Sequence, residues 1–366
     1  MILLNHKSYW KYMLFFELLQ VALENRERLS KTPSAAEWME IYVESERQAV
    51  TGLLVHGIDR LPAEQRPSKV LLLQWIGVGQ MIEQRNRLLN GRCKELLSNL
   101  TSAGLHPTIL KGQGITQCYP EVLRNLRQPG DIDVYVSDGR EKAIEYARSI
   151  GQKYIDWDYQ HLHLKTFNDV EIELHYRVEI LFNLFDNKKL QRWFIDNKTL
   201  LFTKACDLTT PSVEINVVYI LLHIYRHFLT EGVGMRQLLD YYFVLKKANG
   251  IFNCYADGKT LVQTLRYFGI YRFTTGVMWL LQKTCGMEER LMICNPNENE
   301  GYFILSEVMT GGNFGHYDER LKHVGGKMAT LINVLRHNVC IFRHYMSDSI
   351  WASIWLIWHK IWKVTQ

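Results

Sequence analysis

The sequence predicts an α+β protein in which a small sheet is embedded in a largely α-helical chain. Apolar residues recur at helical spacing over residues 8–103 and again from residue 187 to the end. Between these regions lie short segments in which apolar and polar residues alternate, as they do in half-buried strands. We therefore divide the chain into an N-terminal helical region (1–104), a strand-rich core (105–185) and a C-terminal helical region (186–366).

The N-terminal region is expected to contain three helices. A broad apolar stripe predicts a helix over residues 8–28, before a charged end. Ser34, followed three residues later by Glu37, is typical of a capped helix start, and this helix should run towards Thr51. Two prolines then mark a turn, after which apolar spacing predicts a long helix over residues 70–103.

The core is expected to contain four short strands and one helix. Residues 107–110 form the first apolar run, and the second is DIDVYV at residues 131–136. An amphipathic helix should follow over residues 139–150. The next segment, HLHLKTFNDVEIELHYRV, alternates strictly and breaks at Asn168-Asp169, which predicts a hairpin.

The C-terminal region is expected to be helical, with one short extended piece at 199–208. His223 and His227 stand at i and i+4 on one predicted helix, a spacing that can chelate zinc. No Glu follows the first of them, as a metalloprotease would need, so hydrogen-bonded packing histidines are the alternative. Arg236 and Asp240 have the same spacing on the following helix, and we expect them to form an intrahelical ion pair.

Composition limits the possible functions. With 366 residues, 47% hydrophobic and 22% charged, the chain is ordinary globular protein and not a disordered one. A net charge of +5 suits an anionic substrate such as a nucleotide but not a duplex nucleic acid, which needs a denser basic surface. Seven scattered cysteines without a C-x-x-C motif indicate reduced thiols in the cytoplasm. Neither a signal peptide nor a membrane span is expected, because every long apolar run is interrupted by charge.

Two carboxylates stand on one face of the second predicted strand. Asp131 and Asp133 are two residues apart, and side chains alternate across a strand. Such a pair among apolar residues repels unless a cation lies between its members, and hard oxygen ligands suit Mg²⁺ held together with substrate phosphates. The first strand ends in Lys111 and a Gly112–Gly114 turn, which can bring an ammonium group and backbone N–H groups close to an anion.

A third carboxylate, Glu173, follows about forty residues later. By its parity in the strand it shares a face with Glu171, His175 and Arg177. A solvated sheet edge is the alternative interpretation of this charged face. The Asp pair fits that alternative less well, because Asp is disfavoured inside strands.

Together these motifs resemble the DNA polymerase β-type nucleotidyltransferase superfamily, and specifically the uncharacterised bacterial nucleotidyltransferase family 5. The segments that carry the resemblance are Leu110-Lys111-Gly112, Tyr119-Pro120, Arg127, Asp131-Ile132-Asp133 and Glu173-Leu174-His175. It extends over about residues 65–290, where further family-like positions are held by His223, His227, Arg236 and Asp240. The superfamily's usual Gly-Ser before the first acidic strand is absent, and the third acidic residue is Glu instead of Asp.

The resemblance implies a nucleotidyltransferase-type mixed sheet and two-metal transfer of a nucleoside monophosphate from an NTP to an acceptor hydroxyl on a small molecule, glycan or protein. In that chemistry two Mg²⁺ ions activate the hydroxyl and stabilise the charge on the α-phosphate and the leaving pyrophosphate. The resemblance implies that Asp131 and Asp133 bind both ions, and that Glu173 binds the acceptor-side ion or acts as general base. It further implies that the triphosphate is bound by cationic and backbone donors from Lys111, Gly112, Gly114 and Arg127.

Several of these assignments have alternatives. Lys111 could simply end its strand, and Arg127 could pair with Glu121 or Asp131 as part of the scaffold. The same cleft could belong to a non-catalytic module that senses a nucleotide or holds a partner, or to a phosphotransferase that moves a terminal phosphate.

The C-terminal end carries a tryptophan stripe. Four tryptophans fall at i, i+4, i+7 and i+11, followed by two lysines, and so line one helical face: Trp351, Trp355, Trp358, Trp362, Lys360 and Lys363. Such a face suits a helix lying in a membrane surface, which would hold the protein at the inner face of the membrane. A helix docked into the bundle, or a dimer contact, is the alternative.

Overall fold

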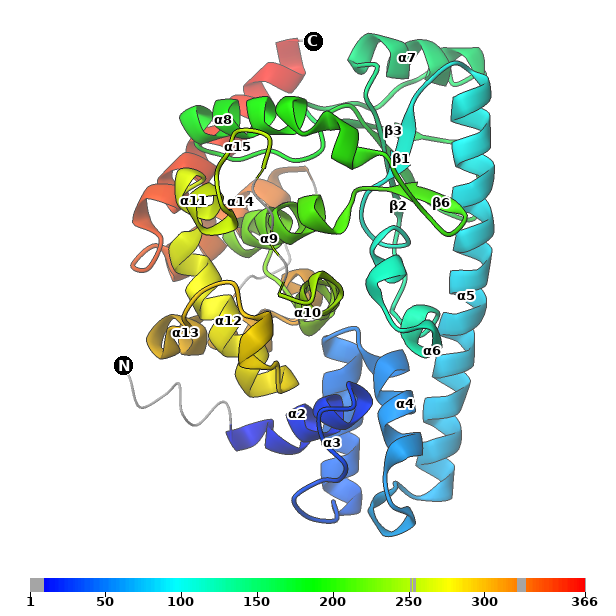
Figure 1. Cartoon of the computed structure of the whole chain (residues 1–366), viewed down its shortest axis with the longest axis vertical. Coiled ribbons are helices and arrows are strands. Elements are labelled where there is room, and N and C mark those ends of the chain that lie inside the picture. Colours follow the sequence, from blue (N-terminus) through cyan, green and yellow to red (C-terminus); the bar gives the residue numbers. More distant parts are fainter. Residues whose placement is uncertain (1–9, 251, 253–254, 321–326, 366) are drawn as a thin grey trace.

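The computed structural model describes residues 10–250, 252, 255–320 and 327–365, and these form a mixed α/β protein (Figure 1). A four-stranded sheet lies beside a long helix, α5 (Lys69–Ser102), which runs along most of the height of the molecule. The N-terminal helices pack at the opposite end of α5 from the sheet, and the C-terminal helices fill the other side. The predicted α+β class, with a small mixed sheet in a largely helical chain, is therefore confirmed.

The N-terminal helices are α2 (Met13–Ala22), α3 (Ala35–Arg47) and α4 (Thr51–Arg60). Helix α3 begins at the predicted capping box, in which the Ser34 hydroxyl accepts the Glu37 N–H and the Glu37 carboxylate accepts the Ser34 N–H. The helix predicted over residues 8–28 ends earlier, because the chain turns at Glu24, which has φ of 63°. Its residues 8 and 9 lie outside the described part.

Helix α5 contributes to two apolar cores. Near its start, Leu71 and Trp75 join a large core with the N-terminal and most C-terminal helices. Towards its end, Leu89, Leu96 and Leu100 join a smaller core beneath the sheet.

The main sheet has the strand order β1-β2-β4-β3. Strands β2 and β4 run parallel in its centre, while β1 pairs with β2 and β3 with β4 in antiparallel fashion. The bounds are β1 (Pro107–Ile109), β2 (Ile132–Val136), β3 (His161–Leu164) and β4 (Ile172–His175). The predicted strands and the hairpin at Asn168-Asp169 are thus all present.

The two faces of the sheet differ in character. One face buries aliphatic side chains such as Val134 and Leu174 against α5 and α7 (Arg140–Ser149). Since side chains alternate along a strand, the charged and histidine side chains lie on the other face. That face is turned towards α9 (Val213–Thr230) and α10 (Met235–Ala248), whose residues line a cavity together with those of the sheet.

The rest of the chain consists of helices, short turns and one small hairpin. The remaining longer helices are α8 (Leu184–Asp196), α11 (Leu261–Tyr267), α12 (Tyr271–Cys285), α13 (Glu298–Gly311), α14 (Lys327–Ile341) and α15 (Met346–Thr365). The short elements are η1 (Ala63–Gln65), η2 (Ile115–Cys118), α6 (Glu121–Arg124), η3 (Lys198–Leu201), η4 (Glu289–Leu291) and η5 (Asn313–Gly315). The extended piece predicted near 199–208 is a hairpin of β5 (Thr203–Ala205) and β6 (Leu208–Thr210).

The tryptophan face of α15 packs against the segment that precedes β3. Trp355 is 5% exposed, and its ring centroid lies 5.0 Å from that of Tyr159. The ring of Trp362 lies 5.3 Å from that of Trp157. The structure therefore has the docked arrangement that was the alternative to membrane attachment of this face.

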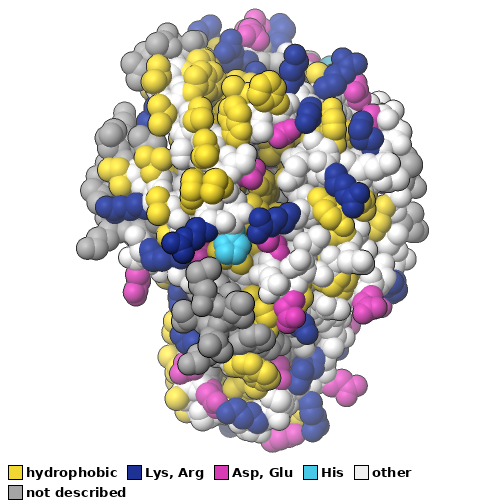
Figure 2. Space-filling model, turned by 90° about the vertical axis from the view of Figure 1, so that its left-hand side faces the viewer, with side chains coloured by type: hydrophobic (Ala, Val, Ile, Leu, Met, Phe, Trp, Pro, Cys, Tyr) yellow, Lys and Arg dark blue, Asp and Glu magenta, His cyan; other side chains and the backbone are white. Residues whose placement is uncertain are grey.

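The outer face of α15 is apolar as well. Its exposed side chains include Ile350, Ile354, Ile357 and Ile361. Hydrophobic side chains gather on the upper part of this side of the molecule in Figure 2. Within the described residues, no helix combines the length and the hydropathy needed to cross a membrane.

Six cysteines lie in the described residues, and none of them forms a disulfide there. Cys254 lies outside that part of the chain.

Candidate functional site

A cavity of about 660 Å³ opens between the polar face of the sheet and helices α9 and α10. The sheet contributes Asp133 and Glu173, Asp131 directly precedes β2, and Lys111 follows the end of β1. Histidine, arginine and acidic side chains from the two helices line the opposite wall, among them His223, Arg226, His227, Arg236 and Asp240. Charged groups of both signs therefore converge on one hollow.

Asp133 and Glu173 lie side by side at the centre of the sheet. The parallel pairing of β2 with β4 sets Asp133 opposite Glu173, so both side chains leave the same face of adjacent strands. A carboxylate oxygen of each residue and a ring nitrogen of His175 all lie within 4.8 Å of one another. The two carboxylates of this set could hold a metal ion, and His175 could join them as a ligand only with a neutral ring.

Two cationic side chains hold Asp133. Its Oδ1 lies 2.7 Å from Lys111 Nζ and accepts a hydrogen bond of 2.9 Å from His175 Nε2, which also lies 3.2 Å from Glu173 Oε2. Burial alone would lower the pKa of His175, but its bonds to the two carboxylates outweigh burial and raise it to about 9. His175 is therefore an imidazolium that bridges the two acids.

Asp131 lies outside this group but lines the same cavity. The neighbouring Asp133 carboxylate, followed by burial, raises the pKa of Asp131 to about 6. Of the three predicted metal ligands, the structure thus brings Asp133 and Glu173 together and leaves Asp131 beside them. Of the three carboxylates, Asp131 is the one whose ionised form is disfavoured, so a cation bound beside it would relieve its repulsion by Asp133.

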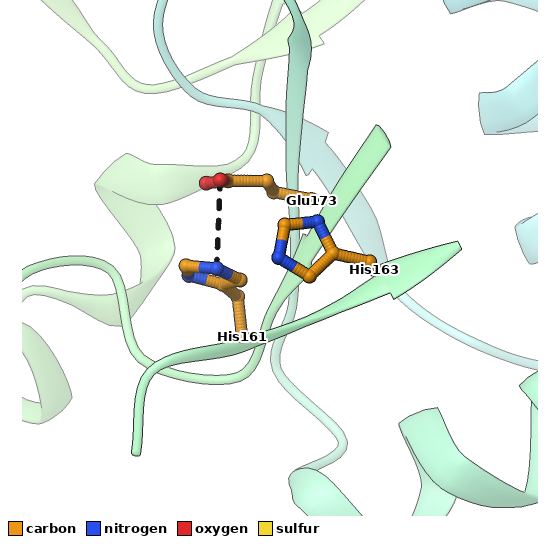
Figure 3. A group of neighbouring side chains, drawn as sticks. All are labelled: His161, His163 and Glu173. Atoms are coloured by element: carbon orange, nitrogen blue, oxygen red, sulfur yellow. Dashed lines mark ion pairs between the residues drawn. The ribbon is translucent and has the colours of Figure 1, made fainter. Parts of the chain in front are cut away.

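A second group of possible ligands shares Glu173. His161 and His163 project from β3 towards Glu173 on the neighbouring strand, as Figure 3 shows. His161 Nε2 lies 3.4 Å from Glu173 Oε1. Burial, followed by the charge of His175, lowers the pKa of His161 to about 4, so His161 is neutral and able to bind a metal. These histidines were missed as site residues, although the alternation His-Leu-His-Leu already placed both on one face.

The Gly112–Gly114 turn reaches the cavity only in part. Gly112 lines it and adopts φ of 53°, a conformation that favours glycine. Gly114 is not among the lining residues, and its N–H donates to Lys111 O at 2.9 Å. A Cβ atom at Gly114 would lie 2.6 Å from Ile109 O, so this glycine permits tight packing of the turn on its own strand.

Arg127 lines the cavity but is bound to Asp240. Its Nε and Nη2 donate to the two carboxylate oxygens of Asp240 at 2.7 and 2.8 Å, and the Tyr119 hydroxyl donates to Oδ1 at 2.7 Å. The scaffold alternative named Glu121 or Asp131 as partner, whereas the partner is Asp240. The predicted intrahelical pair of Arg236 with Asp240 is wrong as well, because the guanidinium fork of Arg127 already takes both oxygens.

Glu179 does not line the cavity but binds two residues that do, and this role was not predicted. It follows β4 and is 0% exposed, with its carboxylate 2.9 Å from His223 Nδ1 and 2.8 Å from Arg226 Nε. Although burial opposes ionisation, Arg226 and His223 hold the pKa of Glu179 well below its usual range. The sequence did contain a signal, since Glu179 is the one acid in the apolar run 178–182 and therefore needed a cationic partner.

The predicted helical histidines are explained by packing and hydrogen bonds. His223 is bound to Glu179, and His227 Nδ1 lies 3.2 Å from Glu231 Oε2. In the described part of the chain, neither histidine belongs to a group of three possible metal ligands. The packing alternative to a zinc site therefore fits the structure.

Comparison with known proteins identifies a family. No curated protein and no solved structure matches this chain. The family model described as "Uncharacterised nucleotidyltransferase" matches residues 34–286, well over half of the chain and further towards the N-terminus than the motifs indicated. The chain therefore belongs to this family of uncharacterised nucleotidyltransferases.

Proposed function

We propose that the protein transfers a nucleoside monophosphate from an NTP to a hydroxyl group of an acceptor, with a divalent cation such as Mg²⁺. Membership of the family supports nucleotidyl transfer in general terms. One observation carries the finer proposal, namely the register that sets Asp133 beside Glu173 on parallel strands facing a cavity of about 660 Å³. The acceptor is a small molecule, a glycan or a protein.

The donor set fits a divalent cation. Asp133 and Glu173 offer carboxylate oxygens within 4.8 Å of each other, and Asp131 adds a third carboxylate in the same cavity. These three residues would hold Mg²⁺, which supplies Lewis-acid activation of the acceptor hydroxyl and stabilises charge on the phosphates. A role for Glu173 as ligand is favoured over one as general base. Burial alone would raise its pKa, but the hydrogen bond from His175 outweighs this and lowers it to about 2.

The reaction makes one bond and breaks one. The acceptor oxygen attacks the α-phosphorus, the bond from that phosphorus to the pyrophosphate oxygen breaks, and the hydroxyl proton passes to solvent or to an ionised carboxylate. Lys111, which lies 2.7 Å from Asp133, would bind a phosphate oxygen once a cation takes over the charge of Asp133.

Pyrophosphate release from each of the four NTPs, with Mg²⁺ or Mn²⁺ and a panel of hydroxyl acceptors, tests the proposal. The neighbouring glutamates give a matched pair, because Glu171 is exposed and outside the cavity lining whereas Glu173 lies within it. Glu173→Gln and Asp133→Asn should reduce the rate at least about a hundredfold, while Glu171→Gln keeps it. Full metal-dependent activity in both site variants would contradict the proposal.

One observation favours a second function, a nucleotide-binding module without catalysis. Asp133 is already neutralised by Lys111 and His175, so its charge is compensated without metal. Nucleotide binding that needs no metal and yields no pyrophosphate with any acceptor would support this module.

A further inference from the structure

Arg236 is a buried cation that lines the cavity without a carboxylate partner. It is the second residue of α10 and is 7% exposed. Its Nη1 donates to Gln128 O at 3.2 Å, while its Nε is buried and has no hydrogen-bond partner. Among the described residues, no ion pair within 4.0 Å joins its guanidinium to an acid. Buried charges in proteins are normally paired, so this arrangement leaves a position for an anion.

The nearest acid on the same helix cannot serve Arg236. Both oxygens of Asp240 are taken by Arg127, and the Tyr119 hydroxyl adds a third hydrogen bond. Asp240 therefore pairs with Arg127 alone, and the guanidinium of Arg236 is left without a carboxylate in hydrogen-bonding contact. Burial and the charge of Arg127 lower the pKa of Arg236 to about 10, a shift in the direction expected for an uncompensated cation.

The start of α10 adds to this positive field but offers few other donors. The N–H groups of Gly234, Met235 and Arg236 donate to Gln237 Oε1, Gln48 Oε1 and Gln48 O at 3.1, 2.9 and 3.3 Å. The helix dipole still favours negative charge at this end. With those three N–H groups occupied, the guanidinium of Arg236 is the charged donor that this helix start offers to a ligand. The Phe314 ring centroid lies 5.2 Å from its Cζ and restricts its orientation.

We propose that Arg236 binds a phosphate group of the nucleoside triphosphate at the end of the cavity beside Asp131. This inference rests on the proposed function and names the contact that the substrate makes with the helical region. Phosphate oxygens match the planar N–H groups of a guanidinium and would satisfy the unpaired Nε. Lys111 and Gly112 line the cavity from the end of β1, and Arg236 would add a phosphate contact from α10.

The test measures binding of inorganic tripolyphosphate and of the four NTPs by calorimetric titration, with and without Mg²⁺. Arg236→Met removes the guanidinium but keeps much of its aliphatic volume, and Arg236→Lys keeps the charge without the fork. Lys247→Met on the same helix is the control for charge, because Lys247 is exposed and outside the cavity lining. We expect Arg236→Met to weaken tripolyphosphate binding about ten- to a hundredfold, Arg236→Lys to weaken it less, and Lys247→Met to leave it unchanged.

Melting curves separate a ligand-binding arginine from a structural one. Without ligand, Arg236→Met should melt at the same temperature as the wild type or higher, because it removes a buried unpaired charge. Added tripolyphosphate should raise the melting temperature of the wild type more than that of the variant. A lower melting temperature at unchanged affinity would overturn the inference, as would unchanged affinity in both Arg236 variants.

The outcomes also separate this inference from the proposed function. Tripolyphosphate binding that depends on Arg236, in a protein without pyrophosphate release, would support the phosphate contact while the transfer reaction fails. If the protein transfers nucleotides and Arg236→Met binds tripolyphosphate as tightly as the wild type, the phosphate contact of Arg236 is overturned while the proposed function stands. If none of the four NTPs displaces tripolyphosphate, the position at Arg236 does not bind a nucleotide phosphate, and the inference is overturned.

Discussion

Replacing Arg127 by methionine should destabilise the ligand-free protein by about 3–5 kcal/mol, the usual cost of breaking a buried ion pair by removing one partner. Arg127 and Asp240 side chains are only 6% and 9% exposed, so water cannot replace the lost hydrogen bonds. The change removes charge-assisted bonds of 2.7 and 2.8 Å and leaves the Tyr119 hydroxyl as the remaining donor to a buried carboxylate. Methionine retains much of the aliphatic volume, so lost packing adds little.

The size of this effect makes it measurable. Domains are commonly stable by about 5–15 kcal/mol, so the loss would be a large fraction of the total. Urea unfolding followed by tryptophan fluorescence gives the free energy of unfolding, provided that the slope with urea is the same in each variant. The double variant Arg127→Met with Asp240→Leu removes both charges and should recover most of the lost stability.

The reasoning would be refuted if Arg127→Met lost less than about 1 kcal/mol, or if the double variant were no more stable than the single one. The same measurement decides between the two roles considered for Arg127. Unchanged stability with weaker NTP binding would make it a substrate-binding residue, contrary to its pairing with Asp240.

Three further predictions concern other parts of the molecule. The pKa of His175 rises from 6.5 to about 9 on folding, so its stabilising protonation is complete below about pH 6.5 and lost as the pH rises through about 9. Between these two pH values, the free energy of unfolding of the metal-free wild type in urea should therefore fall relative to that of His175→Gln. If the two proteins show parallel dependence of stability on pH, His175 is not a bridging imidazolium. In the same assay, Trp355→Ala should lower the free energy of unfolding by about 3–5 kcal/mol. Ile361→Ala, at a position 62% exposed, should change it by no more than about 0.5 kcal/mol. Equal effects of the two changes would argue against docking of the tryptophan face. Lys111→Ala should weaken NTP binding about ten- to a hundredfold in calorimetric titration, with partial rescue by Lys111→Arg, and unchanged affinity would remove its phosphate role.

Local patterns in the sequence were enough to predict the elements of the core. Alternation identified the strand of Asp133 and the hairpin that carries Glu173, because a period of two directly reports a half-buried strand. The same parity placed His175 on the face of Glu173. What parity cannot supply is the register between strands separated by about forty residues, since that is set by packing of the whole sheet on α5 and α7.

Contacts between distant segments account for what the sequence did not predict. The partner of Arg127 lies 113 positions away on α10, and a carboxylate four residues from Arg236 looked like the simpler partner. Trp355 docks on Tyr159, which lies in a segment without a clear periodic pattern, so the docking surface could not be recognised beforehand. Both cases depend on tertiary geometry that overrides local spacing.

The two cores joined by α5 have a practical consequence for dissecting the protein. A fragment that starts just before the sheet would lose the helix end that carries Leu89, Leu96 and Leu100, and with it one wall of the core under the strands. A fragment that starts at α5 would keep this wall but expose Leu71 and Trp75, which are buried in the intact chain. Neither starting point leaves the sheet with its complete core, and a folded fragment with an intact site should begin ahead of α2.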